Sequence, residues 1–342
     1  LKEAVKARMR SHKPVSSMLS GGVDSSTIVA LARNIQAGTG GGPFATFSGV
    51  SEPGEDCRES RFCRRVIEQG GLEAALILPS QVVEFEDRLR EIDRIMEDPF
   101  DLAWIHHRMI YLSARERGHV AVMDGIDGDG VASLTTAYPA YLLRDGQLLT
   151  AHRELIGKWN HYHRRTISLW KTYTDPLRLA LVPEFLRKMK RSLLDRQPGW
   201  LEQSAPISSE FAASTQVAAR QADFRKRVDL GRLDTLRQAH AKRITVPYLT
   251  AGIERYGRIA AACGVEQRQP FLDRRVIEHC LSLPWQQKSR NGWSKFGLRR
   301  VAERVLPTEV AWRTGWDSIL WKFRSARDAL NRERIIEAAS QD

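Results

Sequence analysis

The chain has 342 residues, of which 42% are hydrophobic and 27% are charged, and its formal net charge at pH 7 is +12. This composition is ordinary for a soluble globular protein, and the length predicts one large α/β domain or two lobes. No apolar run approaches the roughly 20 residues that a membrane-spanning helix requires, which argues against an integral membrane protein.

The N-terminus and the cysteines together predict a cytoplasmic protein. Residues 1–8 follow a charged helical pattern, which is not that of a signal peptide. Because the first residue is not Met, the sequence leaves room for a missing N-terminal part. The cysteines have neither Cys-x-x-Cys nor zinc-ligand spacing, so a reduced environment is the simplest expectation. They are Cys57, Cys63, Cys263 and Cys280.

The first 130 residues alternate between strand-like and helix-like segments. The predicted strands are residues 15–19, 44–48, 74–78 and 119–123, and the predicted helices are residues 25–36, 56–69, 83–96 and 103–117. Such alternation predicts an α/β fold, with a parallel sheet and helices on both faces. In open parallel sheets ligands bind beyond the carboxyl ends of the strands, so we expect the functional loops there.

The rest of the chain has helical patterns. The patterns predict an α/β core at residues 1–140, a basic and mostly helical insertion at residues 141–245, and a helical C-terminal part at residues 246–342. The C-terminal part is expected to complete the site of the core. Residues 141–200 hold 12 Lys and Arg against 5 Asp and Glu, most densely at 185–191. A solvated helix face, a nucleic-acid patch and a surface for an acidic or peptidic partner all stay open. No nucleic-acid motif supports the second explanation.

The loop after the first predicted strand carries the clearest motif, Ser20-Gly21-Gly22-Val23-Asp24-Ser25-Ser26. A strand, a tight turn and a helix start aim backbone N–H groups at one point, an arrangement that binds anions. Two glycines let a phosphate approach the backbone closely, and the serines add hydroxyl donors. A carboxylate beside a phosphate repels it unless a cation lies between them, so Asp24 predicts Mg²⁺ here. The plain alternative is a serine-rich helix cap.

A second acidic loop follows the fourth predicted strand, as Asp124-Gly125-Ile126-Asp127-Gly128-Asp129-Gly130. Three aspartates and three glycines at a strand exit are typical of a metal-binding turn, although aspartates also form Asx turns. Together with Asp24, this loop predicts two carboxylates beside a triphosphate, where they could hold Mg²⁺ and neutralise a pyrophosphate leaving group.

Two later segments are ambiguous when taken alone. Residues 264–273 predict a turn before a helix, with Asp273 as the helix N-cap. Residues 292–299 contain Lys295. From this segment alone, Lys295 is expected to be a surface lysine.

Together, the four segments resemble the synthetase domain of glutamine-dependent asparagine synthetases and their relatives, the β-lactam and lasso-peptide macrolactam synthetases. Leu19–Ser26 resembles the family pyrophosphate loop, and Met123–Asp129 resembles its Leu-Ser-Gly-Glu-Gly-Ala-Asp segment. Glu266–Asp273 resembles Glu-x-Arg-x-Pro-Phe-Leu-Asp, and Lys295–Arg299 resembles Lys-x-x-Leu-Arg. The resemblance implies the adenine-nucleotide α-hydrolase-like ATP pyrophosphatase fold.

The resemblance also implies a ligase that uses ATP and Mg²⁺. A substrate carboxylate, from aspartate or a peptide side chain, would attack the α-phosphate, and an amine would then displace AMP. By position, Asp24 and Asp129 would hold Mg²⁺, and Lys295 would stabilise the negative charge on the reacting acyl phosphate. The residues implied around ATP are Leu19, Ser20, Gly21, Gly22, Asp24, Ser25, Ser26, Phe47, Ser48 and Gly125.

The chain departs from the family pattern at points that bear on its substrates. Ile126 stands where asparagine synthetases have Glu and β-lactam synthetases have Tyr, and Gly130 replaces the Glu that usually follows. The chain contains no glutaminase domain, so ammonia would come from a missing domain or from a partner. A peptide macrolactam synthetase, an RNA-modifying ATP pyrophosphatase and a non-catalytic nucleotide-binding protein stay open as alternatives.

Overall fold

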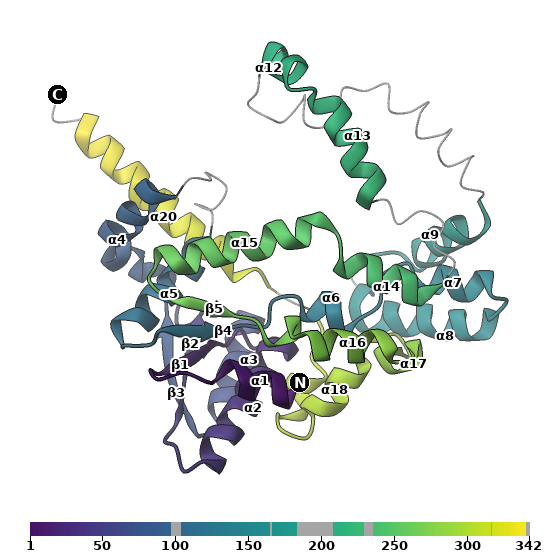
Figure 1. Ribbon diagram of the computed structural model, residues 1–342, viewed down its shortest axis with the longest axis horizontal. Helices are drawn as coiled ribbons and strands as arrows, with labels where there is room; N and C mark the ends of the chain where they lie inside the picture. The colour runs from purple at the N-terminus through teal and green to yellow at the C-terminus, as the bar shows by residue number, and fades with distance from the viewer. Residues whose placement is uncertain (97–103, 165, 183–207, 229–234, 316, 340–342) are drawn as a thin grey trace. The chain divides into compact units, whose positions relative to one another are not determined.

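The computed structural model describes residues 1–96, 104–164, 166–182, 208–228, 235–315 and 317–339 (Figure 1). The first residue of the predicted helix at 103–117 lies outside the described residues, and so does the densest basic stretch, 185–191. The chain divides into two compact units: unit 1 comprises residues 1–133, 251–288 and 295–342, and unit 2 comprises residues 134–250 and 289–294. The division at residues 140 and 245 that the sequence suggests stays a prediction.

A five-stranded parallel sheet forms the centre of unit 1, in the order β3-β2-β1-β4-β5. From β1 the chain moves outward to β3 and then returns to the other side of β1, so the order reverses between β1 and β4. Two loops leave the carboxyl edge at such a switch point, where α/β proteins bind ligands. The strands are β1 (Val15–Met18), β2 (Phe44–Gly49), β3 (Leu72–Ile77), β4 (Ala121–Met123) and β5 (Glu266–Arg268).

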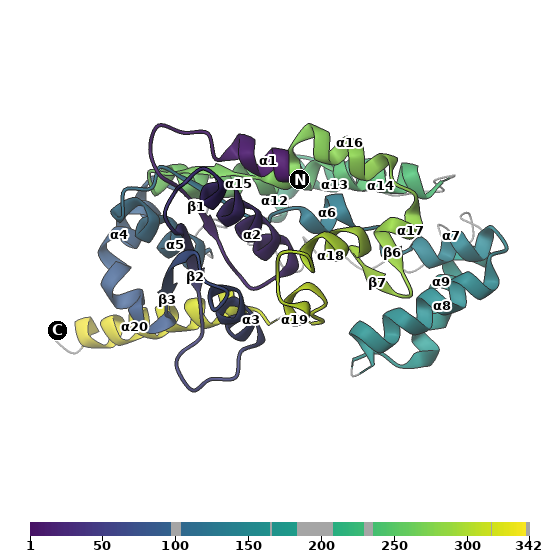
Figure 2. The same ribbon diagram turned by 90° about the horizontal axis from the view of Figure 1, so that it is seen from below.

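Helices cover both faces of this sheet, so the predicted α/β fold is confirmed (Figures 1 and 2). One face packs against α4 (Val82–Ile95), α5 (Ile105–Glu116), α15 (Pro247–Ala262) and α20 (Ile319–Ala339). The other packs against α1 (Lys2–Arg8), α2 (Val23–Gly38), α3 (Arg58–Ile67), α16 (Arg274–Ser282), α18 (Phe296–Ala302) and α19 (Thr308–Ala311). Short segments are η1 (Pro79–Gln81), α6 (Gly128–Ala132), η4 (Pro270–Leu272) and α17 (Trp285–Lys288).

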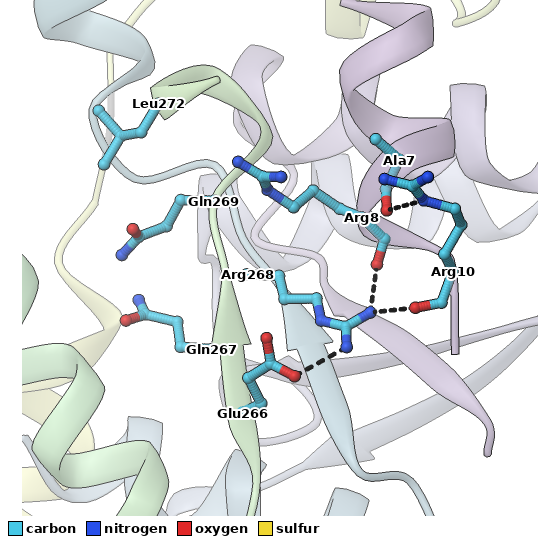
Figure 3. A pocket seen from close by; sticks show the side chains of 8 residues that line it. All are labelled: Ala7, Arg8, Arg10, Glu266, Gln267, Arg268, Gln269 and Leu272. Atoms are coloured by element: carbon cyan, nitrogen blue, oxygen red, sulfur yellow. Dashed lines mark hydrogen bonds and ion pairs between the residues drawn. The ribbon is translucent and has the colours of Figure 1, made fainter. Parts of the chain in front are cut away.

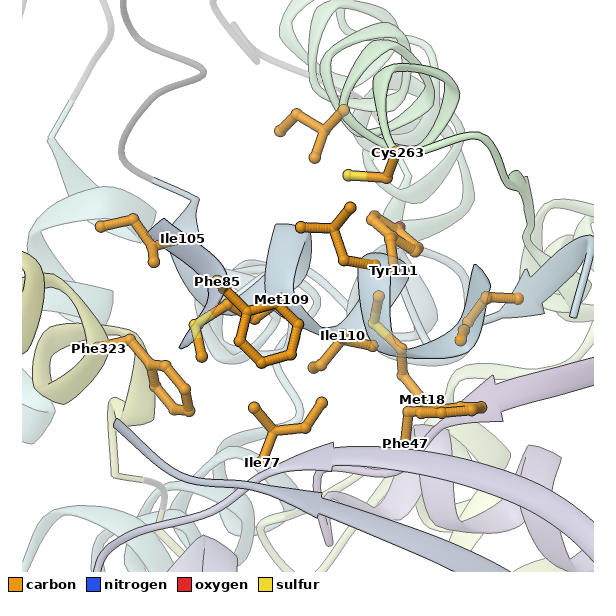
Figure 4. Packing of buried hydrophobic residues seen from close by; sticks show 14 of the residues in the cluster. Met18, Phe47, Ile77, Phe85, Ile105, Met109, Ile110, Tyr111, Cys263 and Phe323 are labelled. Atoms are coloured by element: carbon orange, nitrogen blue, oxygen red, sulfur yellow. The ribbon is translucent and has the colours of Figure 1, made fainter. Parts of the chain in front are cut away.

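The larger core cluster shows how distant parts of the chain close one face of the sheet (Figure 4). Ile105 and Met109, four residues apart on α5, point the same way, as an amphipathic helix requires. Phe323 of α20 is fully buried in the same cluster, beside Gly49 at the end of β2. The helix near the C-terminus therefore contributes to the core of the N-terminal α/β layer.

Strand β5 corrects one expectation. The sequence suggests a turn at 264–273, whereas residues 266–268 form an edge strand that pairs with Ala121–Met123. The backbone N–H of Glu266 donates to Val120 at 2.8 Å, and that of Asp124 donates to Arg268 at 3.1 Å. Every side chain of β5 is polar, so no apolar pattern announces the strand. The predicted N-cap at Asp273 is confirmed, because its carboxylate accepts the backbone N–H of Arg275.

Unit 2 consists of helices and one short hairpin. The hairpin pairs β6 (Ser289–Arg290) with β7 (Trp293–Ser294) in antiparallel fashion. The helices are α7 (Tyr138–Arg144), α8 (Leu148–Lys158), the π-helical turn η3 (Trp159–His163), α9 (Leu169–Leu181), α12 (Ser209–Ser214), α13 (Val217–Val228) and α14 (Leu236–Ile244).

Candidate active site

The loop between β1 and α2 is held in a conformation that only glycine allows at its centre. Gly21 has φ +70°, and a Cβ there would lie 2.5 Å from the backbone nitrogen of Cys63. The carbonyl of Gly21 accepts a hydrogen bond from Arg313 at 2.6 Å. Gly22 then caps α2 with extended backbone, so the first N–H groups of that helix lie at the loop. The structure thus has the tight turn between strand and helix that the sequence predicts, and its binding of an anion stays a prediction.

The serines of this loop take two different positions. The hydroxyls of Ser20 and Ser25 bond one another at 2.9 Å, and Ser25 also accepts the backbone N–H of Ser20 at 3.2 Å. The hydroxyl of Ser26 is buried and has no hydrogen-bond partner in the described structure. Ser20 and Ser25 thus stabilise the loop, while the Ser26 hydroxyl donates to no group in the part of the chain that the structure describes.

The loop after β4 lies directly against the first turn of α2. A Cβ on Gly125 would come within 2.7 Å of the backbone nitrogen of Ser25, and one on Gly128 within 2.5 Å of the Asp24 carboxyl carbon. Both glycines are therefore required by close approach of the two loops. The two loops that the sequence singled out meet at the switch point of the sheet.

A methyl group at Gly128 is expected to separate these loops. Overpacking of this kind costs about 1–3 kcal/mol, so we expect Gly128→Ala to weaken Mg-ATP binding by roughly tenfold. Gly130→Ala is a matched control, because a Cβ at Gly130 meets nothing within 4 Å. Titration calorimetry with Mg-ATP checks the pair, and equal affinities for the two variants would contradict this packing argument.

Lys295 joins the two loops through its charge. Its Nζ lies 2.5 Å from Asp24 Oδ2 and 2.8 Å from Asp129 Oδ1. The Lys295 side chain is only 8% exposed, whereas that of Asp129 is 77% exposed. Lys295 is therefore not the surface residue that its own segment suggested, and the three residues named as catalytic from the sequence lie together.

The protonation of this cluster follows from burial and the neighbouring charges. Burial lowers the pKa of Lys295, but the carboxylates of Asp24 and Asp129 outweigh it and hold that pKa above its ordinary value. The lysine is thus an ammonium ion at neutral pH. Burial raises the pKa of Asp24, and the charge of Lys295 opposes that rise. The cluster provides one fixed cation between two carboxylates.

The carboxylates are suited to a magnesium ion that phosphates also bind. Among the described residues, no three His, Cys, Asp or Glu side chains gather as a metal site. Asp24 and Asp129 nevertheless share one ammonium, so both can reach a single cation, and Asp24 Oδ1 is buried without a partner among the described residues. Nucleotide-bound Mg²⁺ typically takes one or two carboxylates together with phosphate oxygens and water. The residues present fit such an ion.

Asp124 belongs to a supporting network behind the loop. Its Oδ2 accepts from Gln267 Nε2 at 2.6 Å, and its Oδ1 accepts the N–H of Ile126 at 3.0 Å. Burial raises the pKa of Asp124 to about 7. Gln267 also lines a polar cavity of about 510 Å³ beside α1, where Arg268 donates to the carbonyls of Arg8 and Arg10 (Figure 3).

Gln267 and Arg313 support the two candidate loops, and the sequence did not single them out for a role. Gln267 fixes the acidic loop through Asp124, and Arg313 fixes the phosphate loop through Gly21. Both are far along the chain from the loops that they hold. The only sequence signal was their place within or just after the family-like segments.

Two of the predicted nucleotide neighbours direct their side chains into the core. Leu19 is 1% exposed and packs with α2, α3 and α19, and Phe47 is 1% exposed in the cluster of Figure 4. The N–H of Leu19 donates to the carbonyl of Phe47 at 3.1 Å, so their backbones are adjacent. The Ser48 hydroxyl lies 3.3 Å from the thiol of Cys63. Only backbone atoms of Leu19 and Phe47 can therefore border a nucleotide.

Comparisons with known proteins agree with this geometry. The family model for asparagine synthase matches residues 1–317. The chain is 26% identical over 336 residues to "Asparagine synthetase [glutamine-hydrolyzing] 1" of Bacillus subtilis (strain 168), covering 90% of this chain and 46% of that protein. A 62-residue stretch, 17% of this chain, is 44% identical to 11% of the Gallus gallus "Asparagine synthetase [glutamine-hydrolyzing]".

The comparisons show the family and how much of a relative the chain covers. The chain matches the Bacillus protein along most of its own length, but it spans somewhat less than half the length of that protein. None of the helices in the described part of the chain is long and apolar enough to cross a membrane. Because the family model covers nearly the whole sequence, the chain belongs to the asparagine synthase family.

Proposed function

We propose that this chain catalyses ATP-dependent, AMP-forming amide synthesis through an acyl-adenylate, with aspartate or a related carboxylate as the acyl substrate. The observation that supports this most is the Lys295 ammonium, which lies between Asp24 and Asp129 at the sheet's switch point. Membership of a family of ATP-dependent ligases supports the general class of reaction.

The residues divide the work in the proposed reaction. The N–H groups of the Gly21–Gly22 turn and of the first turn of α2 bind the phosphates. Asp24 and Asp129 would hold Mg²⁺, which would supply positive charge to neutralise the pyrophosphate leaving group. Lys295 provides a preorganised positive charge for the acyl phosphate, whose negative charge grows in the transition state. The amine then attacks the acyl carbon and displaces AMP.

The amine source is proposed to lie outside this chain. The relatives are named as glutamine-hydrolysing enzymes, and the chain covers only 46% of the Bacillus protein. We propose that ammonia comes from a glutaminase domain or partner. The four cysteines of the chain are all free, which supports a reducing, cytoplasmic location.

The direct test is product analysis with Mg-ATP, with aspartate and ammonium each present or omitted. Aspartate-dependent formation of AMP, pyrophosphate and asparagine would support the proposal, with the Lys295→Ala protein as the control. Formation of ADP and phosphate would contradict it. A folded, ATP-binding protein that ignores aspartate would instead point to a bulkier carboxylate, such as a peptide side chain.

Ile126 provides a separate test of the substrate. Its N–H donates to Asp124, and its apolar side chain can neither act as a base nor bind an ammonium group. If this position alone limits aspartate use, Ile126→Glu is expected to raise kcat/KM for aspartate by about tenfold, the value of one charged hydrogen bond. Ile126→Gln is the matched control, and an unchanged kcat/KM in both would show that the pocket differs more widely.

A further inference from the structure

The β6–β7 hairpin of unit 2 is too short to be stable by itself. It pairs Ser289 with Ser294 and Arg290 with Trp293, and its turn consists of Asn291 and Gly292. Both turn residues have positive φ, 51° and 79°, which is the geometry of a tight type I′ turn. An isolated hairpin is marginal in water even when longer, so this one requires outside support.

Glu154 on α8 supplies that support with a single buried carboxylate. Its Oε1 accepts the N–H of Asn291 at 2.6 Å, and its Oε2 accepts the N–H of Gly292 at 2.9 Å. Oε2 also accepts the hydroxyls of Tyr138 at 2.8 Å and Ser289 at 3.1 Å. The residue is 3% exposed, so these bonds form away from water.

The Glu154 clamp joins a buried carboxylate to uncharged donors. All four groups that Glu154 accepts from are uncharged, so no cation offsets the loss of hydration of its carboxylate within the described structure. Burying a carboxylate is costly, and four donors are needed to compensate.

The rest of unit 2 fits closely around the same turn. A Cβ on Gly157 of α8 would lie 2.1 Å from the carbonyl oxygen of Asn291, so the helix backbone touches the turn. The ring of His161 stacks on Trp293 at 3.8 Å, and the hydroxyl of Tyr162 bonds that of Ser294 at 3.1 Å. Glu154 is thus one of several residues of unit 2 that contact the hairpin.

The residue that follows the hairpin is Lys295. It adopts φ +55°, a left-handed conformation that costs a residue with a side chain about 1–2 kcal/mol. Such strain persists only where the surroundings impose it, and the hairpin ends at Ser294, one peptide bond before Lys295.

We propose that Glu154 is a positioning residue that, by fixing the 289–294 hairpin, holds the Lys295 ammonium between Asp24 and Asp129. The consequence of this for turnover rests on the proposed function, whereas the positioning of Lys295 does not.

The test compares Glu154→Gln with Glu210→Gln, an exposed glutamate of α12 in the same unit. The carboxamide of glutamine places an NH₂ group where a carboxylate oxygen accepted hydrogen bonds. Those hydrogen bonds are lost, while the volume of the side chain is kept. Hydrogen exchange reports on residues 289–294, and acetic anhydride labelling followed by mass spectrometry reports on Lys295, with exposed Lys2 as the internal reference. Tyr138→Phe removes one of the donors to Glu154, together with an acceptor for the Ser289 hydroxyl, and serves if Glu154→Gln does not fold.

In Glu154→Gln we expect about tenfold faster exchange in the hairpin and about tenfold faster labelling of Lys295, with smaller changes in Tyr138→Phe. AMP formation should fall about tenfold in kcat at an unchanged Kd for Mg-ATP. Faster exchange in the hairpin with unchanged labelling of Lys295 would overturn the proposal, as would unchanged exchange. The expected labelling shift in a protein that makes no AMP would support the positioning role and reject the proposed function alone.

Discussion

Asp24→Asn is expected to slow pyrophosphate release by roughly 100- to 1,000-fold, the usual cost of removing one preorganised electrostatic group from an active site. The carboxamide keeps the size of the side chain but removes the charge that would hold Mg²⁺. It also removes one of the two carboxylates that raise the pKa of Lys295. The variant should therefore disturb both the binding of Mg²⁺ and the pKa of Lys295.

The measurement is the rate of pyrophosphate release from Mg-ATP at saturating carboxylate, together with thermal unfolding to show that the protein is folded. Asp87→Asn is the matched control, because Asp87 is exposed on α4 in the same unit. The two variants should unfold at similar temperatures and differ only in rate. Pyrophosphate release at the wild-type rate in Asp24→Asn would exclude the metal role of this carboxylate.

Sequence reasoning reached much of the fold because local composition dictates it. Strands β1 and β2 lie within one residue of their predicted ends, since each is a short run of buried residues between polar turns. β5 was missed because Glu266-Gln267-Arg268 has no apolar side chain, and its pairing with β4 is a tertiary event. An edge strand made only of polar residues leaves little trace in the sequence.

The candidate site divides in the same way. The two strand-exit loops, at residues 20–26 and 124–130, could be located because glycine and aspartate have positional meaning at strand exits. That Gly125 and Gly128 press against Asp24 and Ser25 could not be recognised, because the close approach arises only when β1 and β4 pair. The support of Asp124 by Gln267 spans 143 residues and depends on the unpredicted strand.

Lys295→Ala is expected to leave the Kd for Mg-ATP within about threefold of wild type and to lower product formation by roughly 100- to 1,000-fold. Asp24 and the loop N–H groups remain to bind the nucleotide, so the loss falls on the transition state, in which the acyl phosphate gains negative charge. An interaction made chiefly in the transition state lowers kcat and kcat/KM equally, whereas one that binds ATP uniformly raises KM alone.

Lys295→Arg sharpens this prediction. The guanidinium keeps the positive charge but is planar and longer, and it cannot place one compact charge 2.5 Å from Asp24 and 2.8 Å from Asp129. If geometry as well as charge matters, Lys295→Arg should recover less than a tenth of wild-type kcat while binding Mg-ATP normally. The Lys295 ammonium contacts both Asp24 and Asp129. Full activity in either variant would therefore mean that Lys295 only neutralises these two carboxylates when no nucleotide is bound.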